Sequence, residues 1–154
     1  MKFVNSYQGK RADETPNETA PFTVADYMAK RLITFRPDQS MNEVILSLLE
    51  NRISGAPVVN ENNELVGIIS EGNCLKHISE SRYHNQPLAE VKVEQYMSRQ
   101  VMTIDYNTDI FEAASKFLNS RIRRFPVLKD GVLIGQISQK DIMKAVLEMK
   151  ASTW

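Results

Sequence analysis

The sequence predicts an α/β fold of the α+β type, built from two β-α-β-β-α repeats that pack about a pseudo-twofold axis. The first observation is an apolar stripe that occurs twice, at a constant shift of 69 positions: Met41, Val44, Ile45, Leu48, Leu49 and Ile53 recur as Ile110, Ala113, Ala114, Phe117, Leu118 and Ile122. The second is a β-hairpin pattern after each stripe. Two copies in a chain of 154 residues should share one core, because neither copy alone buries its apolar face.

Each repeat is expected to begin with a short helical turn and a brief strand. The turns are predicted at 24–28 and 93–97, where Val, Tyr and Met recur at the same shift. The strands are predicted at Leu32–Phe35 and Val101–Ile104. The two copies therefore start with the same elements in the same order.

Long amphipathic helices follow in both repeats, and their starts are marked. Ser40 and Glu43 occupy the two positions of a capping box, in which side-chain oxygens accept N–H groups of the first helical turn. Asp109 and Glu112 take the same places in the second copy. Apolar residues then fall at i, i+3, i+4, i+7 and i+8, a spacing that places them on one helix face.

A β-hairpin and a final helix complete each repeat. The hairpin strands are predicted at 56–59 with 65–69, and at 125–128 with 132–137. Asp130-Gly131 is a typical hairpin turn. The final helices are expected to begin near Ser70 and Ser138, so each of these serines lies where a strand passes into a helix.

These patterns divide the chain into four segments that form one folding unit. They are a flexible N-terminal arm at 1–22, repeat 1 at 23–80, a linker at 81–92 and repeat 2 at 93–150.

Composition limits the classes of partner. Nineteen Lys and Arg residues balance nineteen Asp and Glu residues, so the chain lacks the overall positive field of a nucleic-acid-binding protein. No apolar run approaches the roughly 18 residues of a membrane helix. The first nine residues are too weakly apolar for a secretory signal, and Cys74 has no partner for an internal disulfide. We therefore expect a cytoplasmic protein that binds neither nucleic acid nor membrane.

Leu65–Asn73 and Leu133–Asp141 share the pattern h-x-G-x-I-S-x-x-[ND], where h is apolar. Together with the doubled order of elements, this pattern resembles a tandem pair of cystathionine-β-synthase-type (CBS) domains. The resemblance implies a disc in which two small sheets meet, with two clefts between the copies. It also implies a homodimer and regulation by adenosine-containing ligands: AMP, ADP, ATP or S-adenosylmethionine.

The resemblance places one cleft at the second S-x-x-D segment. The Asp141 carboxylate suits the two hydroxyls of a ribose, while Ser138 and the free N–H groups of a helix start suit a phosphate. Lys140 adds a point charge for a polyphosphate. The first copy is expected to supply an apolar slot for adenine, from Ile33, Ile53, Ser54 and Ala56.

The other cleft departs from the family pattern, because Asn73 stands where a carboxylate is expected. An amide makes weaker, uncharged hydrogen bonds to hydroxyls, so this cleft is expected to favour phosphate-rich ligands or to stay empty. Its predicted residues are Ser70, Asn73, Met102, Ile122, Arg123 and Arg124.

Structural interpretations compete with these sites. Ser138 and Asp141 also fit a simple helix cap, and the arginines also fit a helix end whose dipole they complement. Cys74-x-x-His77 lacks the further ligand that a zinc site requires, so we expect no metal. The chain contains no phosphate loop or nucleophile elbow, so we expect no catalysis.

The leading hypothesis is a regulatory module that binds an adenine nucleotide and acts on a partner protein in trans, with no cofactor required. The alternative is a ligand-free scaffold that dimerises and holds partners together. An enzyme acting on a nucleotide ranks third, because only His77, His84 or Cys74 are available as a base or nucleophile.

Overall fold

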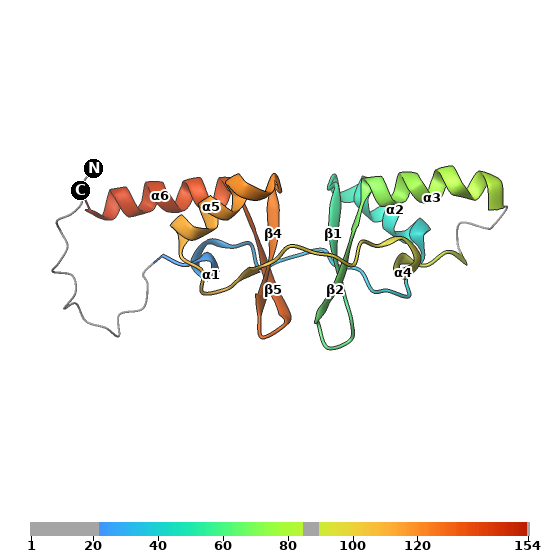
Figure 1. Ribbon diagram of the computed structural model, residues 1–154, viewed down its shortest axis with the longest axis horizontal. Coiled ribbons are helices and arrows are strands. Elements are labelled where there is room, and N and C mark those ends of the chain that lie inside the picture. The colour runs from blue at the N-terminus through green and yellow to red at the C-terminus, as the bar shows by residue number, and fades with distance from the viewer. Residues whose placement is uncertain (1–21, 85–89, 154) are drawn as a thin grey trace.

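The computed structural model describes residues 22–84 and 90–153. The predicted N-terminal arm lies outside these residues except for Phe22, and so does the middle of the predicted linker. The described chain forms two halves side by side, whose hairpins face each other at the centre (Figure 1). Mixed helix and strand content in two small sheets confirms the predicted fold class.

The two halves contain matching elements. The first half contains α2 (Met41–Asn51), β1 (Gly55–Val59), β2 (Leu65–Ser70) and α3 (Glu71–His84). The second contains β3 (Ile104–Asp105), α5 (Ile110–Ser120), β4 (Arg124–Lys129), β5 (Val132–Ser138) and α6 (Gln139–Thr153). Two short helices, α1 (Val24–Tyr27) and α4 (Val93–Tyr96), precede the repeats' other elements. Because α3 continues to His84, it occupies the first residues of the predicted linker. No described helix is long and apolar enough to cross a bilayer.

The two short helices are exchanged between the halves. Val24 of α1 lies in the core of the second half with Phe125, whereas Val93 of α4 lies in the core of the first half with Val58. Figure 1 shows α1 beneath α5 and α6, and α4 beneath α2 and α3. Each half therefore has its own core, completed by a helix of the other repeat, and the predicted single core shared by both copies was wrong.

Main-chain hydrogen bonds hold the exchanged segments in place. After α1, the N–H of Ala29 donates to the carbonyl of Gln136 at 2.9 Å, and the N–H of Gln136 donates back at 3.0 Å. After α4, Ser98 and Ile68 make the same pair of bonds at 2.8 and 2.9 Å. The segments thus join the outer edges of β5 and β2.

The predicted strands after these helices are too long. Leu32–Phe35 contributes one parallel bridge, in which the Phe35 N–H donates to the Pro57 carbonyl at 3.0 Å. Val101–Ile104 is replaced by the two-residue β3, which pairs with β4. The physical reason is the exchange: each segment crosses from one half to the other, so only its end reaches the sheet of its own repeat.

One capping box is confirmed and the other differs. The Ser40 hydroxyl accepts the Glu43 N–H at 3.1 Å, and the Glu43 carboxylate accepts the Ser40 N–H at 3.3 Å. Asp109 instead accepts the N–H of Phe111 at 2.6 Å, one residue nearer than the box requires. Both helices still start where the sequence predicted.

Candidate functional site

The junction between β5 and α6 holds Asp141 in a fixed position. The Ser138 N–H donates to Oδ2 of Asp141 at 2.9 Å, and the Asp141 N–H donates to Oγ of Ser138 at 3.2 Å. This reciprocal pair is a helix cap, as the structural interpretation expected. A carboxylate has further acceptor capacity beyond one such bond, so capping leaves Asp141 able to bind a ligand hydroxyl.

Asp141 lines a cavity of about 340 Å³ between the repeats, here called the Asp141 cavity. It is lined by Ala29, Arg31, Leu32, Ile33, Ile53, Gly55, Arg124, Gln136, Ser138 and Asp141. Four of the lining residues are apolar and come from repeat 1: Ala29, Leu32, Ile33 and Ile53. A carboxylate thus faces an apolar wall across the boundary between the copies.

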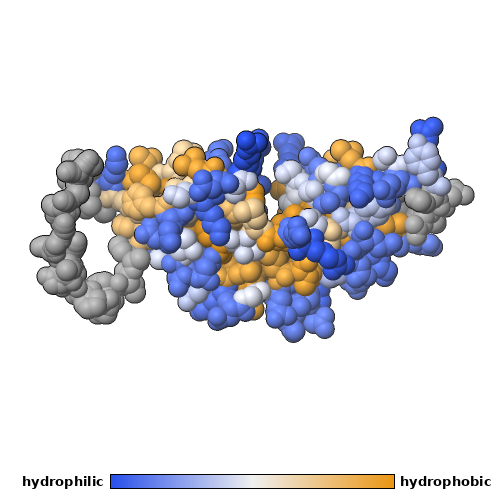
Figure 2. All heavy atoms as spheres, in the orientation of Figure 1, coloured by the Kyte–Doolittle hydropathy of each residue, from blue (hydrophilic) through white to orange (hydrophobic). Residues whose placement is uncertain are grey.

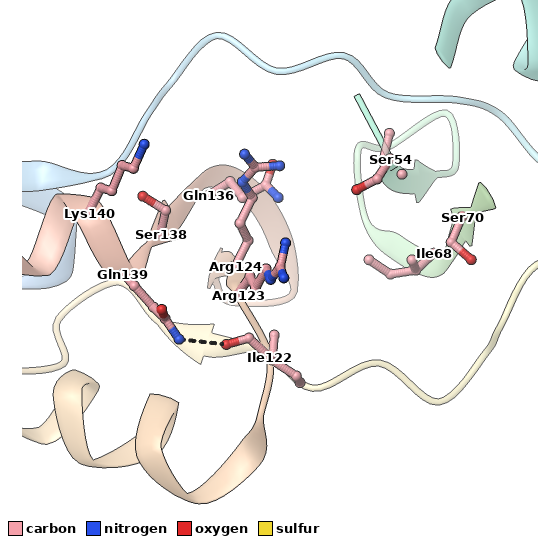
Figure 3. Close-up of a pocket in the computed structure, with 12 residues that line it drawn as sticks. Ser54, Ile68, Ser70, Ile122, Arg123, Arg124, Gln136, Ser138, Gln139 and Lys140 are labelled. Carbon is pink, nitrogen blue, oxygen red and sulfur yellow. Dashed lines mark hydrogen bonds between the residues drawn. The ribbon is translucent and has the colours of Figure 1, made fainter. Parts of the chain in front are cut away.

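A second cavity, of about 510 Å³, lies where the two hairpins meet (Figure 3). This central cavity is lined by Ser54, Gly55, Ala56, Ile68, Ser70, Ile122, Arg123, Arg124, Gln136, Ser138, Gln139 and Lys140. It shares Gly55, Arg124, Gln136 and Ser138 with the Asp141 cavity, so the two spaces adjoin. Both volumes fall within the roughly 300–1,000 Å³ that small-molecule sites occupy.

The residues predicted for the first cleft are divided between these cavities. Ser138 lines both; Asp141, Ile33 and Ile53 line the Asp141 cavity; and Lys140, Ser54 and Ala56 line the central cavity. Ser54 and Ala56 were predicted to line the adenine slot beside Ile33 and Ile53. They lie instead around the start of β1, whose hairpin faces the opposite hairpin across the central cavity.

The residues predicted for the second cleft do not come together. Ser70, Ile122, Arg123 and Arg124 line the central cavity. Asn73 instead lines a cavity of about 390 Å³ beside Tyr96 of α4. Met102 is 48% exposed and lines none of these three cavities.

The hydroxyls at the two equivalent junctions differ. The Ser70 hydroxyl donates to Oδ1 of Asn73 at 2.9 Å, and the same oxygen accepts the Ser70 N–H at 2.8 Å. The Ser138 hydroxyl accepts a bond from the Asp141 N–H, and no acceptor for its own proton lies among the described residues. Ser138 therefore keeps a free donor, whereas the donor of Ser70 is already used.

Gln136 is a lining residue that the sequence analysis missed. Along β5 the buried residues Gly135 and Ile137 alternate with the half-buried Gln136 and Ser138. Because alternate residues of a strand share a face, Gln136 lies on the same face as Ser138. By the same alternation, Ile68 lies on the same face of β2 as Ser70. The residue two positions before each serine could therefore have been predicted to line the cavity.

The third cavity adjoins an aromatic cluster. The Tyr96 hydroxyl donates to Glu80 at 2.7 Å, and this bond raises the pKa of Tyr96. The His77 ring lies 5.0 Å from the Tyr96 ring, and burial lowers the pKa of His77. Within residues 22–84 and 90–153, no three His, Cys, Asp or Glu side chains gather closely enough to hold a metal ion.

Comparison with known proteins now identifies the family. The CBS domain model matches residues 24–80 and 93–148, so the chain belongs to the CBS domain family, with two copies in tandem. It is 30% identical to the CBS domain-containing protein CBSX1, chloroplastic, of Arabidopsis thaliana, over 85% of this chain. The chain spans 66% of the length of that relative, and 41% of a longer archaeal one.

Solved structures of similar proteins contain adenosine compounds. CBSX2 in complex with AMP is 29% identical, with a TM-score of 0.72 over 84% of this chain and 98% of that one. The CBS domain pair of protein MJ0100, in complex with 5′-methylthioadenosine and S-adenosyl-L-methionine, is 26% identical, with a TM-score of 0.64 over 83% and 97%. Two CBS pairs that are similar to this chain thus bind adenosine compounds.

Proposed function

We propose that this chain is a regulatory module that binds an adenosine-containing ligand between its two repeats. The observation that carries the proposal is the Asp141 cavity, in which a fixed carboxylate of one repeat faces Ile33 and Ile53 of the other. The AMP and S-adenosylmethionine complexes of similar CBS pairs support this class of ligand.

Three parts of the site have proposed roles in binding the ligand. Asp141 accepts hydrogen bonds from the ribose hydroxyls. Because its carboxylate is charged, these bonds are stronger than those that a neutral amide would accept. Leu32, Ile33 and Ile53 supply the apolar surface against which adenine packs. Ser138 donates its free hydroxyl to the first phosphate at the start of α6, where unpaired N–H groups also favour an anion.

The regulatory output is proposed to act on a partner protein in trans. The ligand contacts both repeats, so it favours whichever arrangement of the two halves fits it better. Differential affinity for two arrangements is the physical requirement for such a switch. No cofactor is required in this scheme, since the adenine nucleotide is itself the regulatory ligand.

Thermal unfolding with AMP, ADP, ATP and S-adenosylmethionine tests the proposal. Asp141→Asn is the informative variant, because Asn73 shows that an amide also accepts the serine N–H of the cap. We expect this variant to melt near the wild-type temperature without ligand, and to bind adenosine ligands about tenfold more weakly. By contrast, Asp141→Ala also removes the cap, which costs about 1 kcal/mol.

The control is Asp38→Asn, which removes a charge from an exposed position outside all three cavities. It should respond to ligand as the wild type does. An unchanged ligand response in Asp141→Asn would reject the assigned site. No response of the wild type to any of the four compounds would reject the proposed function.

A ligand-free scaffold is the second candidate function. Asn73 in place of an acid favours it, and so does the use of the Ser70 hydroxyl inside its own cap. Under this alternative, no adenosine compound would raise the melting temperature, although oligomerisation would persist.

We propose that the module forms a homodimer through its long helices. Large apolar side chains are exposed along all four: Leu46, Leu49, Leu75, Ile78, Phe111, Leu118, Met143 and Leu147. Figure 2 shows apolar surface over α6 and α3 on the same side of the molecule. Two patches on one side suit a twofold contact between identical chains, the commonest kind in homo-oligomers.

Light scattering after gel filtration tests the dimer. Leu49→Lys combined with Leu118→Lys should convert a dimer into a monomer, because each places a charge in the apolar contact. Asn119→Lys adds a charge at the exposed position next to Leu118 and should leave the dimer intact. A monomeric wild type at micromolar concentration would contradict the proposal.

We propose further that the module is not an enzyme. The residues that line the Asp141 cavity and the central cavity include neither His nor Cys. His77 and Cys74 are buried in the first half instead. The assay is phosphate release from ATP, which should stay at the background rate of buffer; steady turnover would overturn this proposal.

The proposed compartment is the cytoplasm. Cys74 is buried and unpaired, and burial raises the pKa of its thiol, which keeps the group protonated. Protected thiols of this kind suit a reducing compartment. Cell fractionation would test the assignment, and recovery in a membrane or organelle fraction would contradict it.

A further inference from the structure

We infer that the chain binds one nucleotide per chain and prefers nucleotides with two or more phosphates, which the arginines of the predicted second cleft hold. This inference rests on the proposed function and specifies its ligand. The nucleoside occupies the Asp141 cavity, and the phosphate chain extends into the central cavity, where Arg123 and Arg124 lie.

Arg123 and Arg124 extend into the space between the two repeats. They lie where α5 ends and β4 begins, and Figure 3 shows their guanidinium groups in the space between Ser138 of one half and Ser54 of the other. Arg124 lines both cavities, so it stands at their junction. A phosphate chain that extends from Ser138 into the central cavity is therefore within the space that both arginines line.

The side chains around the central cavity carry positive charge. The central cavity is lined by Arg123, Arg124 and Lys140 and by no acidic side chain. Neither arginine nor Lys140 forms an ion pair among the described residues. Unpaired guanidinium groups make strong bidentate bonds to phosphate oxygens, and each further phosphate adds negative charge. The cationic sulfonium of S-adenosylmethionine gains nothing from this cavity.

The residues predicted for the second cleft are spread over different parts of the surface. Asn73 faces the cavity beside Tyr96, and Met102 lies outside all three cavities. The Ser70 hydroxyl is bound to Asn73. Ala56, Ile68 and Ile122 line the central cavity, but no carboxylate among the described residues does, so its arginines serve the ligand at Asp141.

Titration calorimetry of the full chain with AMP, ADP, ATP and S-adenosylmethionine, at fixed ionic strength and without divalent cations, tests the inference. We expect one site per chain, and affinity that rises from AMP to ADP and ATP. The double variant Arg123→Gln with Arg124→Gln should lower the affinity for ATP by about tenfold or more, and the affinity for AMP by less than about threefold.

The control is Lys144→Gln, which removes a cation from an exposed position of α6 that lines none of the three cavities. It should bind ATP as the wild type does. Both arginines are exposed, so the double variant should keep the wild-type circular dichroism and melting temperature.

The outcomes separate the two proposals. AMP and ATP could bind with equal affinity, and the double arginine variant could leave both affinities unchanged. In that case the preference for phosphates is wrong while the proposed function stands. Two sites per chain would likewise overturn the inference alone. If none of the four compounds binds, the proposed function itself fails.

Discussion

Gly135 of β5 packs directly against Met28, the residue that caps the C-terminal end of α1 in the other repeat. A Cβ atom on Gly135 would meet the Met28 side chain and would lie 2.8 Å from the Ala29 carbonyl oxygen. Gly67 has the same relationship to Met97, whose sulfur would lie 2.7 Å away. The glycine of the repeated h-x-G-x-I-S pattern is therefore needed for the close approach of the exchanged segment.

Gly135→Ala should destabilise the protein by about 1–3 kcal/mol, because the added methyl group overpacks the contact with Met28. Urea unfolding at neutral pH measures the change. The control is Gly72→Ala, since a Cβ at that position of α3 would lie 3.7 Å from its nearest atom, in ordinary contact. This control should leave stability unchanged or raise it. Equal stability of Gly135→Ala and the wild type would show that the segment is not packed as described.

Asn63 links the two hairpins and should contribute to stability. Its side-chain amide donates to the Leu133 carbonyl at 2.8 Å, while the Leu133 N–H donates to the Asn63 carbonyl at 2.9 Å. Asn63 has φ of 61°, a conformation that glycine also adopts. Asn63→Gly removes only the side-chain bond, so we expect a loss of about 1 kcal/mol in unfolding free energy. The exposed neighbour Asn62 serves as the control, and Asn62→Ala should cost clearly less.

His77 should make stability depend on pH. Its Nε2 is buried and has no hydrogen-bond partner among the described residues. Burial lowers the pKa of His77 below its usual 6.5, although the charge of Glu80 opposes this shift. The unfolded chain therefore takes up a proton first as the pH falls, and the folded state loses stability below about pH 6.5.

The measurement is urea unfolding of the wild type and of His77→Phe at several values between about pH 5.5 and 7.5, the range in which histidine titrates. The free energy of unfolding should fall with pH in the wild type and fall less steeply in the variant. Equal slopes would mean that His77 does not control this dependence.

Asn73→Asp should not create a second nucleotide site, even though it restores the acid of the family pattern. The side chain at this position lines the cavity beside Tyr96, which no arginine lines. We expect calorimetry to give one site per chain before and after the substitution. A second site in this variant would show that Asn73 alone keeps the second cleft empty.

Much of the fold could be predicted from local sequence signals. The Ser40 cap, the Asp130-Gly131 turn and the paired hairpins all depend on residues close together in the chain, so the sequence carries them directly. The structure has positive φ at both Asp130 and Gly131, as a tight hairpin turn requires.

The exchange of α1 and α4 could not be predicted in this way. Apolar spacing indicates that Val24 and Val93 are buried, but it does not indicate which core receives them. The same limit applies to the candidate site: the residue types around Asp141 were expected, yet the positions of Ser54, Ala56 and Arg123 depend on how the two hairpins face each other. Such contacts between distant segments leave no periodic trace in the sequence.

The exchanged helices make each repeat depend on the other for a complete core. A polypeptide with one copy would fold with the place of Val24 or Val93 vacant, and would have to borrow the missing helix from a twin molecule. A single repeat of this kind could complete its core only in a swapped pair of identical chains. Because one polypeptide supplies both helices here, the two halves can carry different residues at equivalent positions, as they do at Asn73 and Asp141.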